Sequence, residues 1–320
     1  MRKQDFGNRR VAVIGLGTGE FGGKIAESRA REFMDAYAAI GGNLIDTARM
    51  YGDFVTPRNG ESEKIIGRWL TDHHCREQVF LSTKGGHPPL DNMQRSRLSR
   101  EEIRGDMAES LQDLQTDYVD IYWLHRDDEN RPVGEIMETL QSLVEDGNTR
   151  MTGVSNWRPE RITEANRYAV SHGLTPLEAN QIQFSLARQV HCYDPTLINM
   201  DKATWQMHRQ TGMGCFCFSS QAGGFFTKLD ELGWEKLPEN LKNDYGCEEN
   251  LQIMEKLRAL RGETGYSVGA LALAYLTHQP FPTFALVGAS RIEHVLALQE
   301  AGDAVISPQQ RDGLRSFERD

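Results

Sequence analysis

The 320-residue sequence predicts a single-domain (β/α)8 barrel of the α/β class, the architecture known as the TIM barrel. Short apolar runs alternate with amphipathic stretches through nearly the whole chain, which is typical of parallel strands joined by helices. Eight such runs occur, and polar residues follow several of them, as expected where the strands of a closed barrel end at one mouth. We expect one domain over residues 1–320.

The expected strands are short apolar runs with the character of buried strands. In chain order they are Val11–Ile14, Asn43–Ile45, Val79–Thr83, Val119–Leu124, Met151–Val154, Asn180–Phe184, Met213–Phe218 and Phe284–Val287. The expected helices are Lys24–Ile40, Glu61–Thr71, Ser99–Leu114, Val133–Glu145, Pro159–Ser171 and Pro195–Thr211. Start signals support two of them, because Ser99 begins a capping box and Pro159 suits a first helical turn. The long interval Ser219–Tyr266 predicts a loop that folds over a ligand.

Composition excludes several classes of partner. A formal net charge of −10 argues against nucleic acid and anionic membranes, because both attract basic surfaces. The apolar run after the charged N-terminus is broken by glycines, so we do not expect a signal peptide. We expect a cytoplasmic location. The five cysteines lack the spacing of a metal site, which predicts buried thiols and no metal. The oligomeric state is left open.

Gly17, Gly19 and Gly22 match the G-x-G-x-x-G spacing of a dinucleotide-binding loop. In an open-sheet dehydrogenase this loop would bind a pyrophosphate, and Asp46 would bind ribose hydroxyls. That alternative predicts nothing particular at Tyr51 or Lys84. So short a pattern also arises by coincidence, and the motifs described next favour that explanation.

Six motifs follow one another along nearly the entire chain. They are DTARMYG at Asp46–Gly52, STKGG around Lys84, DIYWLHRDD around His125, and then GVSNW, NQIQFS and VGAS. In these motifs and their order the sequence resembles the aldo-keto reductase superfamily. The resemblance implies a (β/α)8 enzyme that reduces an aldehyde or ketone with a nicotinamide cofactor, an NADP-dependent oxidoreductase acting on CH–OH groups.

The resemblance also implies catalytic roles for Asp46, Tyr51, Lys84 and His125. Carbonyl reduction needs a hydride at carbon and a proton at oxygen, and the Tyr51 phenol would supply the proton. Because the ordinary pKa of tyrosine is about 10, we expect the Lys84 ammonium, held by Asp46, to lower it. His125 would orient the carbonyl. Taken singly, each of the four has an ordinary structural interpretation: a helix cap, a loop aromatic residue, a surface lysine and a core histidine.

Cofactor-binding residues follow from the same resemblance. Ser155, Asn156 and Gln181 would bind the nicotinamide carboxamide, and Phe218 would stack on the ring or serve only as a core residue. The other candidates are Gly17, Thr18, Asp46, Ser219, Lys228, Gly288, Ser290, Arg291 and His294. A bidentate contact from Arg291 to a 2′-phosphate favours NADPH, with NADH as the alternative.

Four loop residues are candidates for substrate contact, namely Phe54, His87, Arg126 and Trp157. His87 and Arg126 suggest a polar or anionic small molecule such as a sugar-derived carbonyl, although each also suits an ordinary solvated loop. An alternative function on the same fold is a regulatory subunit that binds the cofactor and senses its redox state.

Overall fold

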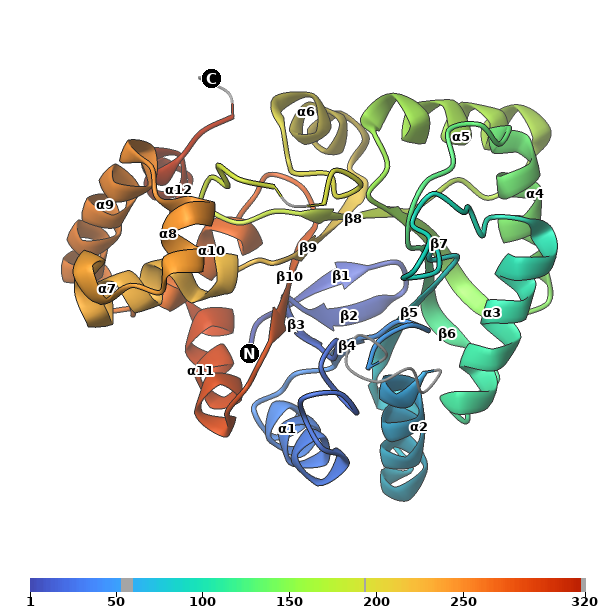
Figure 1. Cartoon of the computed structure of the whole chain (residues 1–320), viewed down its shortest axis with the longest axis horizontal. Helices are drawn as coiled ribbons and strands as arrows, with labels where there is room; N and C mark the ends of the chain where they lie inside the picture. The colour runs from blue at the N-terminus through green and yellow to red at the C-terminus, as the bar shows by residue number, and fades with distance from the viewer. Residues whose placement is uncertain (53–59, 193, 318–320) are drawn as a thin grey trace.

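The structure, a computed structural model, describes residues 1–52, 60–192 and 194–317. Eight parallel strands form a closed barrel in which β10 pairs with both β9 and β3 (Figure 1). The barrel strands are β3 (Ile14–Gly17), β4 (Leu44–Asp46), β5 (Phe80–Gly85), β6 (Val119–Leu124), β7 (Thr149–Ser155), β8 (Ala179–Gln183), β9 (Gly214–Phe218) and β10 (Thr283–Gly288). The predicted (β/α)8 barrel is confirmed, and the closed sheet excludes the open-sheet alternative.

The helices surround this barrel (Figure 1). They are α1 (Glu27–Ala39), α2 (Glu61–His73), α3 (Arg100–Asp113), α4 (Val133–Glu145), α5 (Pro159–His172), α6 (Lys202–Thr211), α7 (Phe225–Lys236), α8 (Glu239–Tyr245), α9 (Glu248–Thr264), α10 (Val268–Thr277), α11 (Ile292–Asp303) and α12 (Pro308–Leu314). The six predicted helices correspond to α1–α6. The largest difference is the start of α6, because Asp201 caps this helix by accepting a hydrogen bond from the Thr204 amide.

The predicted first strand, Val11–Ile14, is wrong. An antiparallel hairpin of β1 (Lys3–Phe6) and β2 (Arg9–Ala12) precedes the barrel, and the first barrel strand begins only at Ile14. The apolar side chains of the hairpin reach the barrel interior, where the Phe6 ring lies 5.3 Å from that of Phe284 and 5.4 Å from that of Phe216. The hairpin therefore closes the end of the barrel at which the strands begin.

The predicted loop over Ser219–Tyr266 is also wrong, because this interval contains α7, α8 and α9. Most of its Lys and Glu residues lie on the solvent side of these helices, whereas Asn250 is buried. The buried side is apolar at helical spacing, for example at Ile253, Leu257 and Leu260 in α9. A glycine at φ +74°, Gly233, interrupts the helical conformation within α7.

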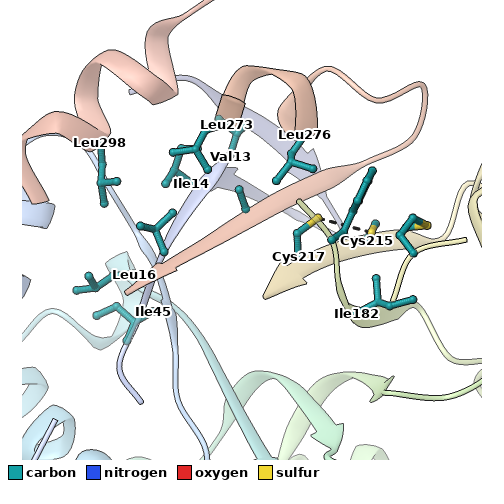
Figure 2. Packing of buried hydrophobic residues seen from close by; sticks show 14 of the residues in the cluster. Val13, Ile14, Leu16, Ile45, Ile182, Cys215, Cys217, Leu273, Leu276 and Leu298 are labelled. Carbon is teal, nitrogen blue, oxygen red and sulfur yellow. Dashed lines mark hydrogen bonds between the residues drawn. The ribbon is translucent and has the colours of Figure 1, made fainter. Parts of the chain in front are cut away.

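The outer faces of the strands pack against the helical layer (Figure 2). Leu273 and Leu276 of α10 and Leu298 of α11 lie in the same buried cluster as side chains of β3, β4, β8 and β9. Cys215 and Cys217 share one face of β9, as expected, with their sulfur atoms 3.8 Å apart. The expectation that all five thiols are buried is wrong for Cys192, which is exposed, and for Cys247, which is half-buried.

The glycine-rich segment after β3 forms a tight turn ahead of α1. Gly22 has a φ of +76°, and a Cβ atom there would lie 2.3 Å from Cγ of Glu61. The turn closes with a bridge between Phe21 and Ile25, and α1 begins two residues later. In this fold the glycines allow the chain to turn against α2. No helix in the described part of the chain is long and apolar enough to span a membrane.

Candidate active site

Three of the four predicted catalytic side chains are joined by hydrogen bonds where the strands end. Asp46 is the last residue of β4, Lys84 lies near the end of β5, and Tyr51 follows β4. The Lys84 ammonium donates to Asp46 Oδ2 at 2.6 Å and to the Tyr51 hydroxyl at 3.1 Å. Both charged side chains are buried, with 1% of Lys84 and 2% of Asp46 exposed. A buried ion pair thus holds a cation against a phenol.

His125 completes this group from the end of β6. Its ring centroid lies 6.0 Å from that of Tyr51 and 4.7 Å from that of His87. Burial lowers the pKa of His125 well below its ordinary value, and the neighbouring His87 and Lys84 act in the same direction. The imidazole is therefore neutral at neutral pH, a form that can both donate and accept a hydrogen bond.

The prediction that the pKa of Tyr51 is lowered is wrong, because the combined effect of its surroundings raises it. Burial raises the pKa of Tyr51 more than the Lys84 ammonium lowers it, so the net direction is upward. Burial alone would lower the pKa of Lys84, but the Asp46 carboxylate and the Tyr51 hydroxyl outweigh that effect and raise it. At neutral pH the site consequently presents a protonated phenol next to a charged ammonium.

Two further side chains hold the Asp46 carboxylate: Ser82, which the sequence analysis missed, and Gln181, which it assigned to the carboxamide. Ser82 donates to Asp46 Oδ1 at 2.7 Å and accepts a hydrogen bond from the Trp123 indole at 2.6 Å. Gln181 also donates to Asp46 Oδ1, at 2.9 Å. Ser82 could have been found from its spacing, since residues two apart on a strand face the same side and Lys84 faces the site.

The predicted carboxamide-binding residues lie beside this group. Ser155 ends β7 and pairs in register with Gln181 of β8. Asn156 follows with a φ of +61°, and its side-chain amide donates to the His125 carbonyl at 3.3 Å and to Ser155 Oγ at 3.0 Å. The structure therefore brings Ser155, Asn156 and Gln181 to the same mouth of the barrel as the four catalytic candidates.

The remaining cofactor candidates occupy adjacent strand ends. Gly17 of β3 pairs with Gly288 of β10, and Thr18 donates to the Asp46 carbonyl at 2.9 Å. Phe218 ends β9, and Ser219 follows it with a φ of +51°. The other four candidates, Lys228, Ser290, Arg291 and His294, are on α7 or at the start of α11.

The charged residues near the start of α11 include two cations that could contact a phosphate group. Arg291 and His294 are exposed, and Arg291 Nη2 lies 2.9 Å from His294 Nε2. Burial lowers the pKa of His294, and the charges of Arg291 and Lys228 lower it further, while Glu293 and Glu231 act in the opposite direction. The two cations therefore act on one small region of the surface, whose chemistry suits a phosphate group.

The loop from β9 into α7 suits a second anionic group. Ser219, Ala222, Gly223 and Gly224 all have positive φ, between 50° and 81°. The loop leads directly into the N-terminus of α7, where free backbone N–H groups and the helix dipole favour anions. With the phosphate-binding chemistry of Arg291 and Lys228, the donor groups present fit a phosphorylated dinucleotide.

The substrate candidates differ in their surroundings. Phe54 lies outside the described residues. His87 is nearly buried, and burial and then the Arg126 charge lower its pKa to about 4. Trp157 has no exposed surface and donates to the Arg126 carbonyl at 3.2 Å, so it supports this loop from beneath.

Arg126 lies next to the four catalytic candidates, but protein atoms engage its guanidinium. It donates to the His125 carbonyl at 2.9 Å and to Thr196 Oγ1 at 3.0 Å, and it lies 3.5 Å from Asp194 Oδ2. The nearby carboxylate offsets its charge. This arrangement weakens the argument for an anionic substrate.

The decisive comparison is with a family model. Residues 13–319 match the model of the aldo/keto reductase family. The chain belongs to the aldo/keto reductase family. Among the described residues of this aldo/keto reductase, no cluster of three or more His, Cys, Asp or Glu side chains could hold a metal ion.

Individual relatives align over most of their length. A Saccharomyces cerevisiae protein named "Putative aryl-alcohol dehydrogenase" is 30% identical, over 96% of this chain and 81% of that protein. The norsolorinic acid reductase of Aspergillus flavus is 27% identical, over 94% of this chain and 76% of that protein. An aldo-keto reductase of Emericella nidulans is 28% identical, over 96% of this chain and 78% of that protein.

Proposed function

We propose that this aldo/keto reductase reduces an aldehyde or ketone to an alcohol with NADPH and uses Tyr51 as the proton donor. The observation that carries the proposal is the Lys84 ammonium, which hydrogen-bonds both the Tyr51 hydroxyl and the Asp46 carboxylate at the mouth of the barrel. Membership in the family supports carbonyl reduction in general.

The side chains of the site account for the proton that the reaction consumes. When bound, the nicotinamide cofactor supplies the hydride that the carbonyl carbon accepts. Tyr51 transfers its phenolic proton to the carbonyl oxygen, which gives the alcohol and leaves a phenolate. The Lys84 ammonium stabilises that phenolate, and the neutral His125 ring hydrogen-bonds and orients the carbonyl. Proton transfer from a positioned group typically contributes about 10² to 10⁴ in rate.

We assign the cofactor-binding roles by the chemistry of the donor groups. Ser155, Asn156 and Gln181 would hold the carboxamide, and Phe218 would stack on the ring. The loop from Ser219 to the start of α7 would bind the pyrophosphate. Arg291 and Lys228 would bind the 2′-phosphate, and their two positive charges favour NADPH over NADH.

For the substrate we propose an aryl aldehyde or ketone. The name of the yeast relative specifies an aryl alcohol, which is the product of such a reduction. The surroundings of the site agree, because His87 is neutral and Asp194 offsets the charge of Arg126. Both observations argue against the anionic sugar derivative that the sequence suggested.

The test is a screen of NADPH oxidation over aromatic aldehydes, short aldehydes, aldoses and sugar acids. We expect turnover with several carbonyl compounds and the highest kcat/KM with an aromatic aldehyde. Binding of NADPH without turnover of any compound would favour the regulatory, redox-sensing alternative. A preference for sugar acids would contradict the proposed substrate class.

A further inference from the structure

The first turn of α2 connects three strand ends around the candidate active site. The Ser62 hydroxyl lies 3.0 Å from the carbonyl oxygen of Thr18, after β3, and 3.0 Å from Thr47 Oγ1, after β4. Glu63, the next residue, accepts a hydrogen bond from Thr83 of β5 at 2.5 Å. None of these α2 side chains belongs to the reacting group described above.

Glu63 approaches Lys84 through the strand that carries it. Thr83 lies between Ser82 and Lys84, and its side chain points to the opposite face of β5 from theirs. Ser82 and Lys84 both donate to Asp46, whereas Thr83 donates to Glu63. The hydrogen bond from Thr83 to Glu63 therefore holds β5 on the face opposite the site, at the residue that precedes Lys84.

Glu63 approaches Tyr51 through Arg49. Glu63 Oε2 lies 3.5 Å from Arg49 Nη1, and the same nitrogen donates to Asp113 Oδ2 at 3.0 Å. The Arg49 amide donates to the Lys84 carbonyl at 2.9 Å. Arg49 precedes Tyr51 by two residues. Its guanidinium also donates to Glu109 at 2.8 and 2.9 Å, so Glu63 is one of three carboxylates that hold this segment.

We infer that Glu63 is a positioning residue for the Tyr51–Lys84 pair and acts through Thr83 and Arg49. Glu63 has no exposed surface and touches neither Asp46 nor Tyr51 in any hydrogen bond of the described residues, so its effect is indirect. The inference rests on the proposed function, because it concerns how the proton donor of that reaction is held.

The surroundings of Glu63 suit such a role. Burial raises the pKa of Glu63 to about 7, while the Thr83 hydroxyl and the Arg49 guanidinium act against this and favour the carboxylate. A buried carboxyl group is costly unless its partners are held in place. Glu63→Gln keeps the size of the side chain and removes its charge, so this variant probes the contacts rather than the packing.

The experiment compares Glu63→Gln and Thr83→Val with Asp120→Asn as a matched control. Asp120 is an equally buried, ion-paired carboxylate that contacts Arg9 and Arg76. It lies near the start of β6 and accepts a hydrogen bond from the Leu81 amide near the start of β5, away from the strand ends that carry the candidate site. For each variant we measure kcat and KM for the best carbonyl substrate, the Kd of NADPH by fluorescence quenching, and the melting temperature.

We expect Glu63→Gln and Thr83→Val to lower kcat by about 10- to 100-fold, as small displacements of catalytic groups do, with the Kd of NADPH changed less than about twofold. Asp120→Asn should lower the melting temperature and leave kcat unchanged. The double variant of Glu63 and Thr83 should be no slower than the slower single variant, because both remove one connection. If Glu63→Gln does not fold, Thr83→Val, which removes only a hydroxyl, still tests the inference.

Two results separate failure of the inference from failure of the proposed function. If Tyr51→Phe abolishes turnover but Glu63→Gln and Thr83→Val behave like the Asp120 control, the positioning role is refuted and the proposed reaction stands. If Tyr51→Phe turns over like the wild type, the proposed reaction itself is refuted.

Discussion

Replacement of Lys84 by methionine removes the cation that hydrogen-bonds both the Asp46 carboxylate and the Tyr51 hydroxyl. The methionine side chain keeps most of the buried stem, so packing changes little. Asp46 loses a hydrogen bond of 2.6 Å, Tyr51 loses one of 3.1 Å, and the Thr47 carbonyl loses one of 2.7 Å. Because the site is almost completely buried, water does not readily replace these contacts.

The effect on stability follows from the carboxylate left behind. Removing one partner of a buried ion pair typically costs about 3–5 kcal/mol. Asp46 retains hydrogen bonds from Ser82 and Gln181, so we expect the lower end, about 3 kcal/mol, in the free energy of unfolding. The pKa of Lys84 is raised in the folded protein, so the wild type has this stabilisation at neutral pH and loses it as the pH rises through that raised pKa, above about 10.4.

The effect on catalysis follows from the phenol. Without the ammonium, Tyr51 loses the largest of the effects that offset the burial opposing its ionisation, so proton transfer becomes harder. We expect kcat to fall by about 10² to 10⁴. Urea unfolding measures the first effect, and NADPH oxidation at saturating carbonyl substrate measures the second.

The double variant Asp46→Asn with Lys84→Met is the control for this prediction. Replacing the unpaired Asp46 carboxylate should restore most of the lost stability. Turnover should stay low, because the Tyr51 phenol still lacks the Lys84 ammonium. If the free energy of unfolding of Lys84→Met falls by less than about 1 kcal/mol, the Asp46 carboxylate is not left buried without compensation. A kcat within tenfold of the wild type would refute the catalytic role of the ammonium.

Two further predictions concern the cofactor and the histidine. Arg291→Ala should raise the Kd of NADPH at least about tenfold, the range for a lost charge-assisted contact, and leave that of NADH nearly unchanged; equal losses would mean that Arg291 does not meet the 2′-phosphate. His125 should remain neutral throughout the range above its ordinary pKa of about 6.5, as followed by NMR of its ring. Because its folded pKa is depressed, its contribution to stability should be present above pH 6.5 and lost as the pH falls; protonation near pH 6.5 would contradict the burial argument.

The gathering of the candidate side chains at one mouth could be predicted from the sequence because most of them follow expected strands. Asp46, Lys84 and His125 lie within three successive strand–loop motifs, and a closed barrel brings such positions to one mouth. The pKa direction of Tyr51 was predicted wrongly, since it depends on the balance between burial and one charge. That balance is fixed only once distant segments have packed.

Other features left no usable signal in the sequence. The hairpin before the barrel was hidden because Val11–Leu16 is one continuous apolar run, although β2 ends at Ala12 and β3 begins at Ile14. The roles of Trp123 and Glu63 depend on contacts between residues 20 and 41 positions apart, whereas Ser82 could have been found because it faces the same side of its strand as Lys84. Such contacts become visible only in three dimensions, where β4, β5 and β6 lie next to one another.

The most direct test of the central claim is Tyr51→Phe, assayed for NADPH oxidation with the best carbonyl substrate and for NADPH binding by fluorescence quenching. This variant removes only the phenolic hydroxyl that Lys84 contacts. If Tyr51 donates the proton, kcat falls by at least about 10², while the Kd of NADPH stays within about twofold of the wild type. Unchanged turnover with intact binding would show that the proton comes from another group.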